Sequence, residues 1–201
     1  QDVHSLTASK LFNIHYDEVS HQQRSVGKTI NFGIIYGMSS FGMSAGLHIP
    51  QKDAEQFIQQ FYASYPNIKI YYDNYLKNAK TKGFVETMLG RKRYVFEDPK
   101  KKFIDNSMRR VLMNYPIQGT AAELMKKGMV AVHQKIMPKY PDISLLLTIH
   151  DDLVFEMPEN EKQDEVIKEI QALLCSIHPL SVPLAVDVKI GKKWGELQKI
   201  V

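Results

Sequence analysis

The chain has 201 residues, of which 44% are hydrophobic and 24% charged, and a formal net charge of +4. This composition is typical of a globular protein with one domain, or with two small domains that share a core. No stretch approaches the ~20 apolar residues of a transmembrane helix, so no membrane span is expected. The single cysteine, Cys175, excludes an internal disulfide framework and favours a reducing compartment, the cytoplasm.

The first part of the chain has helical patterns, broken by glycine and proline. Gly37 and Gly83 are expected to end two of these helices, and Pro66 separates two others. Ser5 or Thr7 is a candidate N-cap for the first helix. The predicted helices cover 5–13, 22–36, 51–64 and 67–82, with a turn or short helix at 41–50.

In the second part of the chain, the spacing of the apolar residues is no longer helical throughout. Residues 83–96 contain β-branched and aromatic residues around a glycine and are predicted to form a hairpin or an extended excursion. A long helix is expected over 105–137, bent or interrupted by Pro116 and Gly119. Two apolar runs at 144–149 and 153–157 predict a β-hairpin, 159–176 a further helix, and 182–191 a final strand. The expected fold class is therefore α+β, with a helical part followed by a small antiparallel sheet backed by helices.

One face of the helix at 22–36 could bind a nucleotide. Four residues exceed one helical turn by about 40°, so residues spaced by four form a slowly drifting stripe. Two cations followed by two aromatic rings suit the phosphates, and then the sugar and base, of a nucleoside triphosphate. The neighbouring Gly27 and Gly33 would allow a close approach to the backbone. A surface helix with exposed cations and partly buried rings is the alternative. The stripe consists of Arg24, Lys28, Phe32 and Tyr36.

The turn of the predicted C-terminal hairpin is acidic. Asp151 and Asp152 lie between its two apolar runs. Phosphoryl transfer to a 3′ hydroxyl commonly uses two divalent ions, and Mg²⁺ prefers carboxylate oxygens as ligands. The alternative is that both aspartates are ordinary turn residues.

Basic residues cluster in one region of the chain. Such a cluster suits phosphate binding, and a solvated basic face is the alternative. The cluster comprises Arg91, Lys92, Arg93, Lys100, Lys101, Lys102, Arg109 and Arg110.

Several motifs together resemble family A DNA polymerases. Residues 24–37 match the pattern of the family's fingers helix, in which Arg is followed after three residues by Lys and after seven more by Tyr-Gly. Residues 150–154 resemble the palm motif His-Asp-Glu-Leu-Val, residues 114–126 the segment that reads the primer-template minor groove, and 90–95 and 191–194 also align. The resemblance runs without large insertions from about residue 1 to residue 200.

The resemblance implies roles for particular residues. Arg24 and Lys28 would bind the triphosphate of the incoming dNTP, with Lys28 acting in catalysis. Phe32 would stack near its sugar and base. His4, from the preceding helix, would touch the phosphates. Tyr36 would occupy the template-base position in the open enzyme, and the adjacent Gly37 would contact DNA. Phenylalanine rather than tyrosine at 32 would disfavour dideoxynucleotides.

The resemblance also implies contacts with DNA and metal. Asp151 would be a metal ligand and catalytic residue, for one of two Mg²⁺ ions. Asp152 replaces the family's usual glutamate with a side chain one methylene shorter, so it would reach less far as a second metal ligand. The implied primer-template contacts are made by Arg110, Asn114, Gln118 and His150. For Gln118, a cap at a helix N-terminus is the alternative.

The family's other metal-binding aspartate and its ribonucleotide-excluding glutamate lie upstream of the sequence DVHSLTA. We therefore expect the chain to be part of a longer polymerase and inactive alone, with fingers at 1–103 and the C-terminal part of the palm at 104–201. Its partners would be primer-template DNA, dNTPs and the remainder of the polymerase. Two alternatives are a non-catalytic nucleic-acid-binding fragment and a relative of the single-subunit RNA polymerases.

Overall fold

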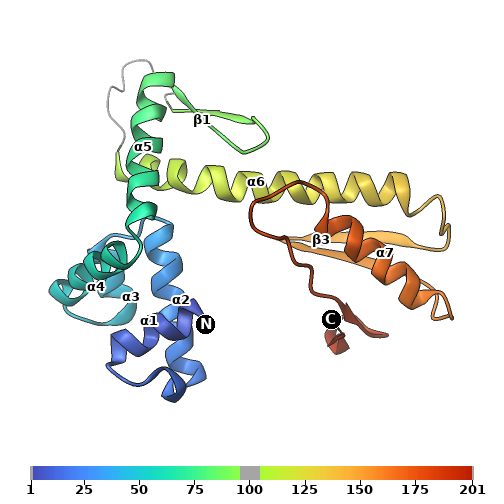
Figure 1. The fold of residues 1–201 in the computed structure, drawn as a ribbon, viewed down its shortest axis with the longest axis horizontal. Helices are drawn as coiled ribbons and strands as arrows, with labels where there is room; N and C mark the ends of the chain where they lie inside the picture. Colours follow the sequence, from blue (N-terminus) through green and yellow to red (C-terminus); the bar gives the residue numbers. More distant parts are fainter. Residues whose placement is uncertain (1, 96–104, 201) are drawn as a thin grey trace. The chain divides into compact units, whose positions relative to one another are not determined.

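The computed structural model describes residues 2–95 and 105–200 (Figure 1). Contacts divide the chain into two compact units, Gln1–Gly119 and Thr120–Val201. Helices dominate the first unit, and the second contains antiparallel hairpins and helices, so the predicted α+β class is confirmed. The predicted boundary between 103 and 104 falls where the structure is not described and stays a prediction.

Five helices and a short 3-10 turn open the first unit. Their starts are set by capping side chains: those of Asp2, Ser20 and Ser39 each accept a backbone hydrogen bond from the residue three positions on. The expected caps Ser5 and Thr7 were therefore wrong, because Asp2 begins the first helix earlier. The elements are α1 (Val3–Phe12), the 3-10 helix Tyr16–Glu18, α2 (His21–Ile35), α3 (Ser40–Leu47), α4 (Gln51–Ser64) and α5 (Pro66–Lys82).

The helical predictions for this region are largely confirmed. The bounds of α4 are those expected, and the short segment before it is helix α3 rather than a turn. Pro66 occupies the first turn of α5, where its missing N–H costs nothing, and Gly83 ends α5 with a φ of 75°. The apolar faces of α2, α3 and α4 bury a shared core of Ile30, Ile34, Met43, Ala54 and Phe61.

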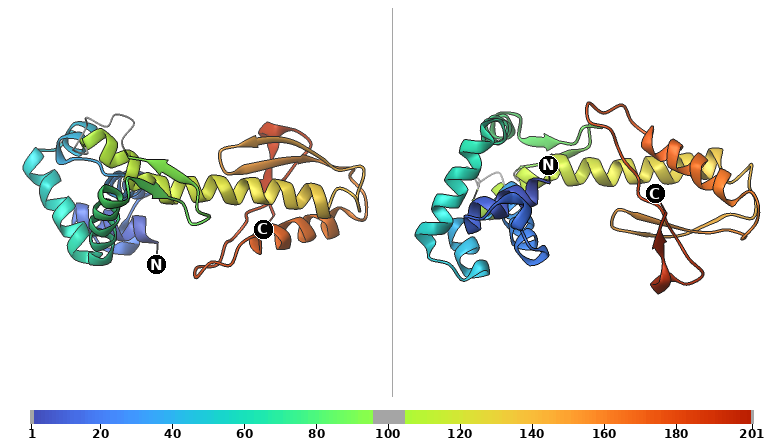
Figure 2. Two further views of the ribbon diagram at one scale, coloured as in Figure 1. Left: turned by 90° about the horizontal axis from the view of Figure 1, so that it is seen from above. Right: turned by 60° about the horizontal axis from the view of Figure 1, so that its bottom comes forward.

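Helix α1 lies directly against α2 (Figures 1 and 2). Gly27 makes this approach possible, since a Cβ atom there would lie 2.2 Å from the carbonyl oxygen of His4 and 3.0 Å from the backbone nitrogen of Ala8. The expected close approach at Gly27 is therefore confirmed, and the approaching group is the backbone of α1. At Gly33, the side chain of Met38 fills the corresponding space.

Gly27→Ala is expected to destabilise the protein by roughly 1–3 kcal/mol, the usual cost of overpacking. Alanine favours helix by about 1 kcal/mol over glycine, but backbone atoms of α1 cannot move aside as a flexible side chain would. Urea unfolding followed by circular dichroism measures the change.

Gly46 in α3 provides the matched control. A Cβ atom at Gly46 would meet nothing within 4 Å, so Gly46→Ala should stabilise by roughly 0.5–1 kcal/mol through helix propensity. Equal stability of the two variants would contradict the close packing of α1 on α2.

The predicted hairpin after Gly83 is confirmed. Strands β1 (Phe84–Glu86) and β2 (Lys92–Tyr94) pair antiparallel, with Val85 opposite Arg93. The hairpin shares a core with α5 and α6 (Asn106–Lys135). This core consists of Tyr72, Leu76, Ala79, Val85, Val95, Leu112 and Met113.

Helix α6 runs through Pro116 and Gly119 without the expected interruption (Figure 1). Proline removes one backbone hydrogen bond and normally costs ~3 kcal/mol in a helix interior. Pro116 and the preceding Leu112 and Met113 are buried, and burial of an apolar face stabilises a helix within a fold. Gly119 serves packing, because a Cβ atom there would lie 2.6 Å from the side chain of Thr87 in the hairpin loop.

In the second unit a hairpin packs on helices. Strands β3 (Ser144–Ile149) and β4 (Asp152–Glu156) pair antiparallel, and α7 (Gln163–Cys175) follows. Val132 of α6, Ile136 in the turn just after α6, Ile143 before β3, and Val166 and Ile170 of α7 form the buried core. The predicted sheet backed by helices is thus confirmed, although each described sheet has two strands.

The predicted strand at 182–191 was wrong for most of its length. Only Lys189–Ile190 (β5) is a strand, paired with Gln198–Lys199 (β6), next to a short 3-10 turn at Trp194–Glu196. Exposure still alternates along 184–190, as the sequence pattern indicates. A strand also needs a partner for its backbone groups, and the Val186 carbonyl instead accepts a hydrogen bond of 2.8 Å from the side chain of Gln171.

Candidate functional site

The stripe on α2 has the expected geometry. Helix α2 begins at a capping box between Ser20 and Gln23. The Lys28 ammonium lies 5.6 Å from the centre of the Phe32 ring. The rings of Phe32 and Tyr36 stack with their centres 5.9 Å apart and an interplanar angle of 11°. Phe32 is 39% exposed, so a ligand can reach this face.

Arg24, at the start of the stripe, is already paired with a carboxylate. Its Nε and Nη2 atoms donate to the two oxygens of Asp2, each at 3.0 Å. Asp2 also accepts from the backbone N–H of Ser5 at 2.8 Å and from its hydroxyl at 2.7 Å. The Asp2 carboxylate thus caps α1 and also pairs with the guanidinium of Arg24 on α2. The sequence analysis missed Asp2, whose signal is an acidic N-cap just before a helix.

The Arg24 guanidinium, and then the Ser5 hydroxyl and N–H, hold the pKa of the Asp2 carboxyl well below its usual value of 3.8. A carboxyl whose pKa is lower in the folded state stabilises that state above its unfolded pKa. The contribution is lost as the pH falls through the folded-state pKa.

Asp2→Asn tests this linkage, since asparagine caps helices as well as aspartate but carries no charge. We expect the amides of α1 to exchange hydrogen about two- to fivefold faster in the variant at pH 7, as for a partly exposed ion pair. The difference should shrink as the pH falls below 3.8. Hydrogen-exchange protection factors measure it, and a difference that persists unchanged at pH 2 would contradict the ion-pair account.

His4 lies beside the same stripe. Its ring centre is 5.4 Å from that of Phe32, with an interplanar angle of 55°. Its Nδ1 atom contacts the side chain of Asn31, which is buried between α1 and α2. The structure therefore brings together His4, Lys28, Phe32 and Tyr36, with Arg24 at the end of the same face.

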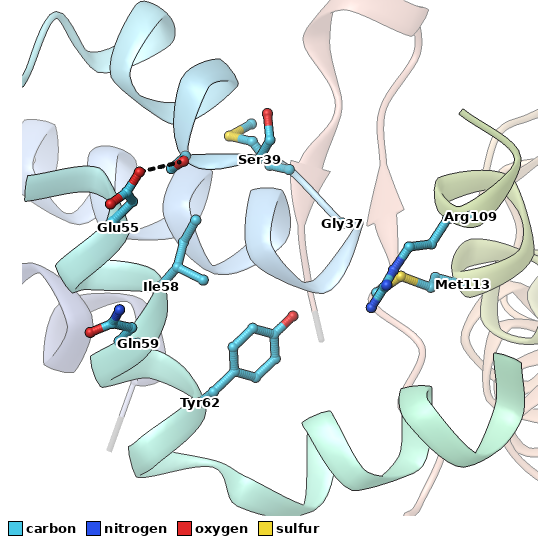
Figure 3. Close-up of a pocket in the computed structure, with 10 residues that line it drawn as sticks. Gly37, Ser39, Glu55, Ile58, Gln59, Tyr62, Arg109 and Met113 are labelled. Carbon is cyan, nitrogen blue, oxygen red and sulfur yellow. Dashed lines mark hydrogen bonds between the residues drawn. The ribbon is translucent and has the colours of Figure 1, made fainter. Parts of the chain in front are cut away.

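A pocket of about 390 Å³ opens where α2 ends (Figure 3). Gly37, with a φ of 76°, lies on one side, and Tyr62 of α4 and Arg109 of α6 project toward the space. Burial raises the pKa of the Tyr62 hydroxyl, which the nearby Arg109 opposes. A Cβ atom at Gly37 would lie 3.1 Å from the Arg110 side chain, so glycine serves both the backbone conformation and the packing.

Three of the predicted DNA contacts follow one face of α6. Arg110, Asn114 and Gln118 are spaced by four residues, and Arg110 and Gln118 are exposed. The Oδ1 atom of Asn114 is buried and has no hydrogen-bond partner among the described residues. The alternative of Gln118 as an N-terminal cap was wrong, because Gln118 lies inside α6.

The acidic hairpin has a tight turn. Ile149 pairs with Asp152, so His150 and Asp151 form the turn between β3 and β4. His150 has a φ of 54°, a left-handed conformation that is uncommon outside glycine. Both aspartates are exposed. No cluster of three or more potential metal-ligating side chains occurs in residues 2–95 and 105–200. A magnesium site of one or two carboxylates completed by substrate phosphates still fits this donor set.

The structure describes only some residues of the basic cluster. Lys92 lies 4.5 Å from the centre of the Phe84 ring in the first hairpin, and Arg109 is 3.9 Å from Asp73. Arg91, Arg93 and Arg110 are exposed, whereas Lys100, Lys101 and Lys102 lie outside the described residues. Among the helices of the described ranges, none is both long and apolar enough to cross a bilayer.

Comparison with known proteins assigns the family. The sequence model of DNA polymerase family A matches residues 1–196. The chain is 39% identical over 198 residues to DNA polymerase I of Caldicellulosiruptor bescii and 37% identical over 197 residues to the thermostable DNA polymerase I of Thermus aquaticus. The alignments cover 97% and 96% of this chain but 23% of each relative. The chain therefore belongs to DNA polymerase family A and spans about a quarter of the length of these curated relatives.

A solved structure agrees. The POL domain of Pol1 from M. smegmatis, in complex with DNA primer-template and dNTP, matches with a TM-score of 0.82 and 32% sequence identity. The match covers 92% of this chain and 32% of that chain. The predicted family is confirmed, and it separates this chain from the single-subunit RNA polymerases.

Proposed function

We propose that this chain is part of a template-directed DNA polymerase, which transfers a nucleotide from a dNTP to the 3′ end of a primer. The observation that carries the proposal is the face of α2 on which Lys28, Phe32 and Tyr36 follow one another, in a chain of DNA polymerase family A. The M. smegmatis relative, in complex with primer-template and dNTP, supports it.

In the first unit, cations and rings would bind the dNTP. Arg24 and Lys28 would bind the triphosphate, because their N–H groups donate to phosphate oxygens. Arg24 would exchange the carboxylate of Asp2 for phosphate or bind both. Phe32 would pack near the sugar and base, and Tyr36 with Gly37 would contact the template.

Lys28 would also act in catalysis. As the 3′ oxygen attacks the α-phosphorus, the bond to the leaving pyrophosphate breaks and negative charge builds on the phosphate oxygens. A fixed ammonium stabilises that charge more in the transition state than in the ground state.

In the second unit, the acidic turn would hold a metal ion. Asp151 would be the ligand, and Asp152 a second one with a shorter reach than the family's glutamate. Of the two Mg²⁺ ions in the complete active site, one would activate the 3′ oxygen and the other would neutralise the leaving pyrophosphate. His150, in its left-handed conformation, would contact DNA beside it.

The face of α6 that carries Arg110, Asn114 and Gln118 would follow the primer-template. Asn114 and Gln118 would donate to the N3 and O2 acceptors that every base pair presents in the minor groove. Such contacts check the shape of the pair without reading its sequence. Arg110, on the same face, would contact the primer.

The rest of the polymerase would complete the active site. We propose fingers at 1–103 and the C-terminal part of the palm at 104–201, with a further metal-binding aspartate in the longer protein. The cytoplasm, and in a bacterium its nucleoid, is the proposed location.

Primer extension tests the proposal. The longer polymerase that contains these residues should extend a primed template with dNTPs and Mg²⁺, whereas residues 1–201 alone should not. Extension by the chain alone, abolished by Asp151→Ala, would show that these residues contain a complete metal site. No extension by the longer protein would contradict the polymerase assignment.

A further inference from the structure

Asn31 is a polar side chain buried where α1 meets α2, with 2% of its surface exposed. Buried amides are normally hydrogen-bonded, so its partners indicate its purpose. The Nδ2 atom lies 3.2 Å from the carbonyl oxygen of Val3 and 3.1 Å from Nδ1 of His4. The Oδ1 atom lies 2.9 Å from the hydroxyl of Thr7.

These contacts define the orientation of the amide. The carbonyl oxygen of Val3 can only accept a hydrogen bond, so the Asn31 atom facing it must be the Nδ2 donor. The hydroxyl of Thr7, which also lies 3.0 Å from the carbonyl oxygen of Val3, can donate to Oδ1. The amide cannot be reversed without placing two acceptors against each other.

The orientation of Asn31 in turn determines the tautomer of His4. Nδ2 also lies 3.1 Å from Nδ1 of the imidazole, and with Nδ2 as the donor, Nδ1 must accept and carry no proton. A neutral imidazole then carries its proton on Nε2. Asn31 uses only Nδ1, which leaves Nε2–H for another partner.

The packing of α1 places His4 at a fixed position along the stripe. The backbone of His4 lies against Gly27, and its ring lies beside that of Phe32, with centres 5.4 Å apart. Lys28 contacts the same Phe32 ring. A ligand bound along the stripe therefore passes the His4 ring.

We propose that Asn31 is a positioning residue that holds His4 as the Nε2–H tautomer, so that Nε2 donates a hydrogen bond to the triphosphate. The nucleotide part of this inference rests on the proposed function. Phosphate oxygens accept hydrogen bonds, so Nε2–H suits them, whereas the other tautomer would direct a lone pair at an anion.

Nitrogen NMR of the intact polymerase with ¹⁵N-labelled histidine tests the tautomer without activity. The His4→Gln variant identifies the His4 signals by their loss. At pH 8 we expect Nδ1 to show the shift of an unprotonated nitrogen and Nε2 that of a protonated one. A protonated Nδ1, or an averaged mixture of tautomers, would overturn the assignment to Asn31.

Two variants at the same contacts separate positioning from packing. In Asn31→Asp the carboxylate can only accept, so the proton should move to Nδ1 of His4. Thr7→Val removes the hydroxyl bonded to Oδ1 but keeps the Nδ2 donor, so it should leave the tautomer unchanged. A tautomer that is identical in Asn31→Asp and wild type would contradict the proposal.

Binding of inorganic tripolyphosphate tests the nucleotide part. Asn31→Leu, which removes the Nδ2 donor without adding charge, should raise the Kd about fivefold, as for one lost hydrogen bond. His4→Gln should have a similar effect, and the double variant should be no weaker than either single variant. Additive effects would mean that Asn31 acts on helix packing alone.

The two parts can fail separately. If wild-type protein bound no tripolyphosphate, the proposed nucleotide site and the donor role of His4 would both be wrong. The tautomer result would still decide whether Asn31 positions the ring.

Discussion

Asp151→Asn is expected to lower the maximal rate of nucleotide incorporation by about 10³-fold or more, with little change in dNTP affinity. Asparagine suits the turn between β3 and β4 as well as aspartate does, so the hairpin should remain intact. It lacks the negative charge that would hold a divalent ion, and such an ion supplies several kcal/mol of transition-state stabilisation. Rapid-quench measurement of single-nucleotide incorporation, in the longer polymerase with saturating dNTP, measures the change.

Two matched variants show whether the effect belongs to Asp151. Asp142 is also exposed and lies just before β3, so Asp142→Asn should leave the rate within about twofold, as for a surface substitution. Asp152→Asn should cost less than Asp151→Asn, since the shorter side chain at 152 is the weaker ligand candidate. A rate for Asp151→Asn above a tenth of wild type would contradict its role as a metal ligand.

Lys28→Met is expected to lower the same rate by about 10²–10³-fold, as loss of one transition-state stabilising group does. Methionine keeps an unbranched stem beside the Phe32 ring and favours helix about as well as lysine, so α2 should remain folded. What is lost is the ammonium that we propose binds the triphosphate. Pre-steady-state incorporation at several dNTP concentrations separates the rate from the affinity.

Lys52 provides the control, because it is an exposed lysine in the first turn of α4. Lys52→Met removes the same charge from the same unit and should change neither rate nor affinity by more than about twofold. Lys28→Arg should restore part of the rate, since arginine keeps the charge but differs in geometry. Full activity of Lys28→Met would place the triphosphate elsewhere.

Local sequence patterns were sufficient for most of the fold. The amphipathic spacing of α4, the glycine that ends α5 and the apolar runs of β3 and β4 predicted elements that the structure confirms. Each depends on interactions within a few residues. The α2 stripe was predictable for the same reason, because residues four apart on a helix share a face.

Local patterns failed where distant contacts compete with them. Pro116 has the signature of a helix break, yet α6 continues because its surroundings bury that segment. Residues 182–187 have the alternation of a strand, but no strand in the described part of the chain pairs with them, and the side chain of Gln171 bonds the Val186 carbonyl instead. Neither Gln171 nor the burial of Pro116 follows from nearby residues.

The sequence by itself determined the family, the α+β class and the face of α2 that carries Arg24 and Lys28, because motifs and helical spacing are properties of consecutive residues. Only the tertiary structure decided which groups from other helices meet that face. Asp2 holds Arg24, which lies 22 positions along the chain. Asn31 orients His4, which lies 27 positions before it. Such contacts depend on the approach of α1 to α2 at Gly27, which is set by packing rather than by any local pattern.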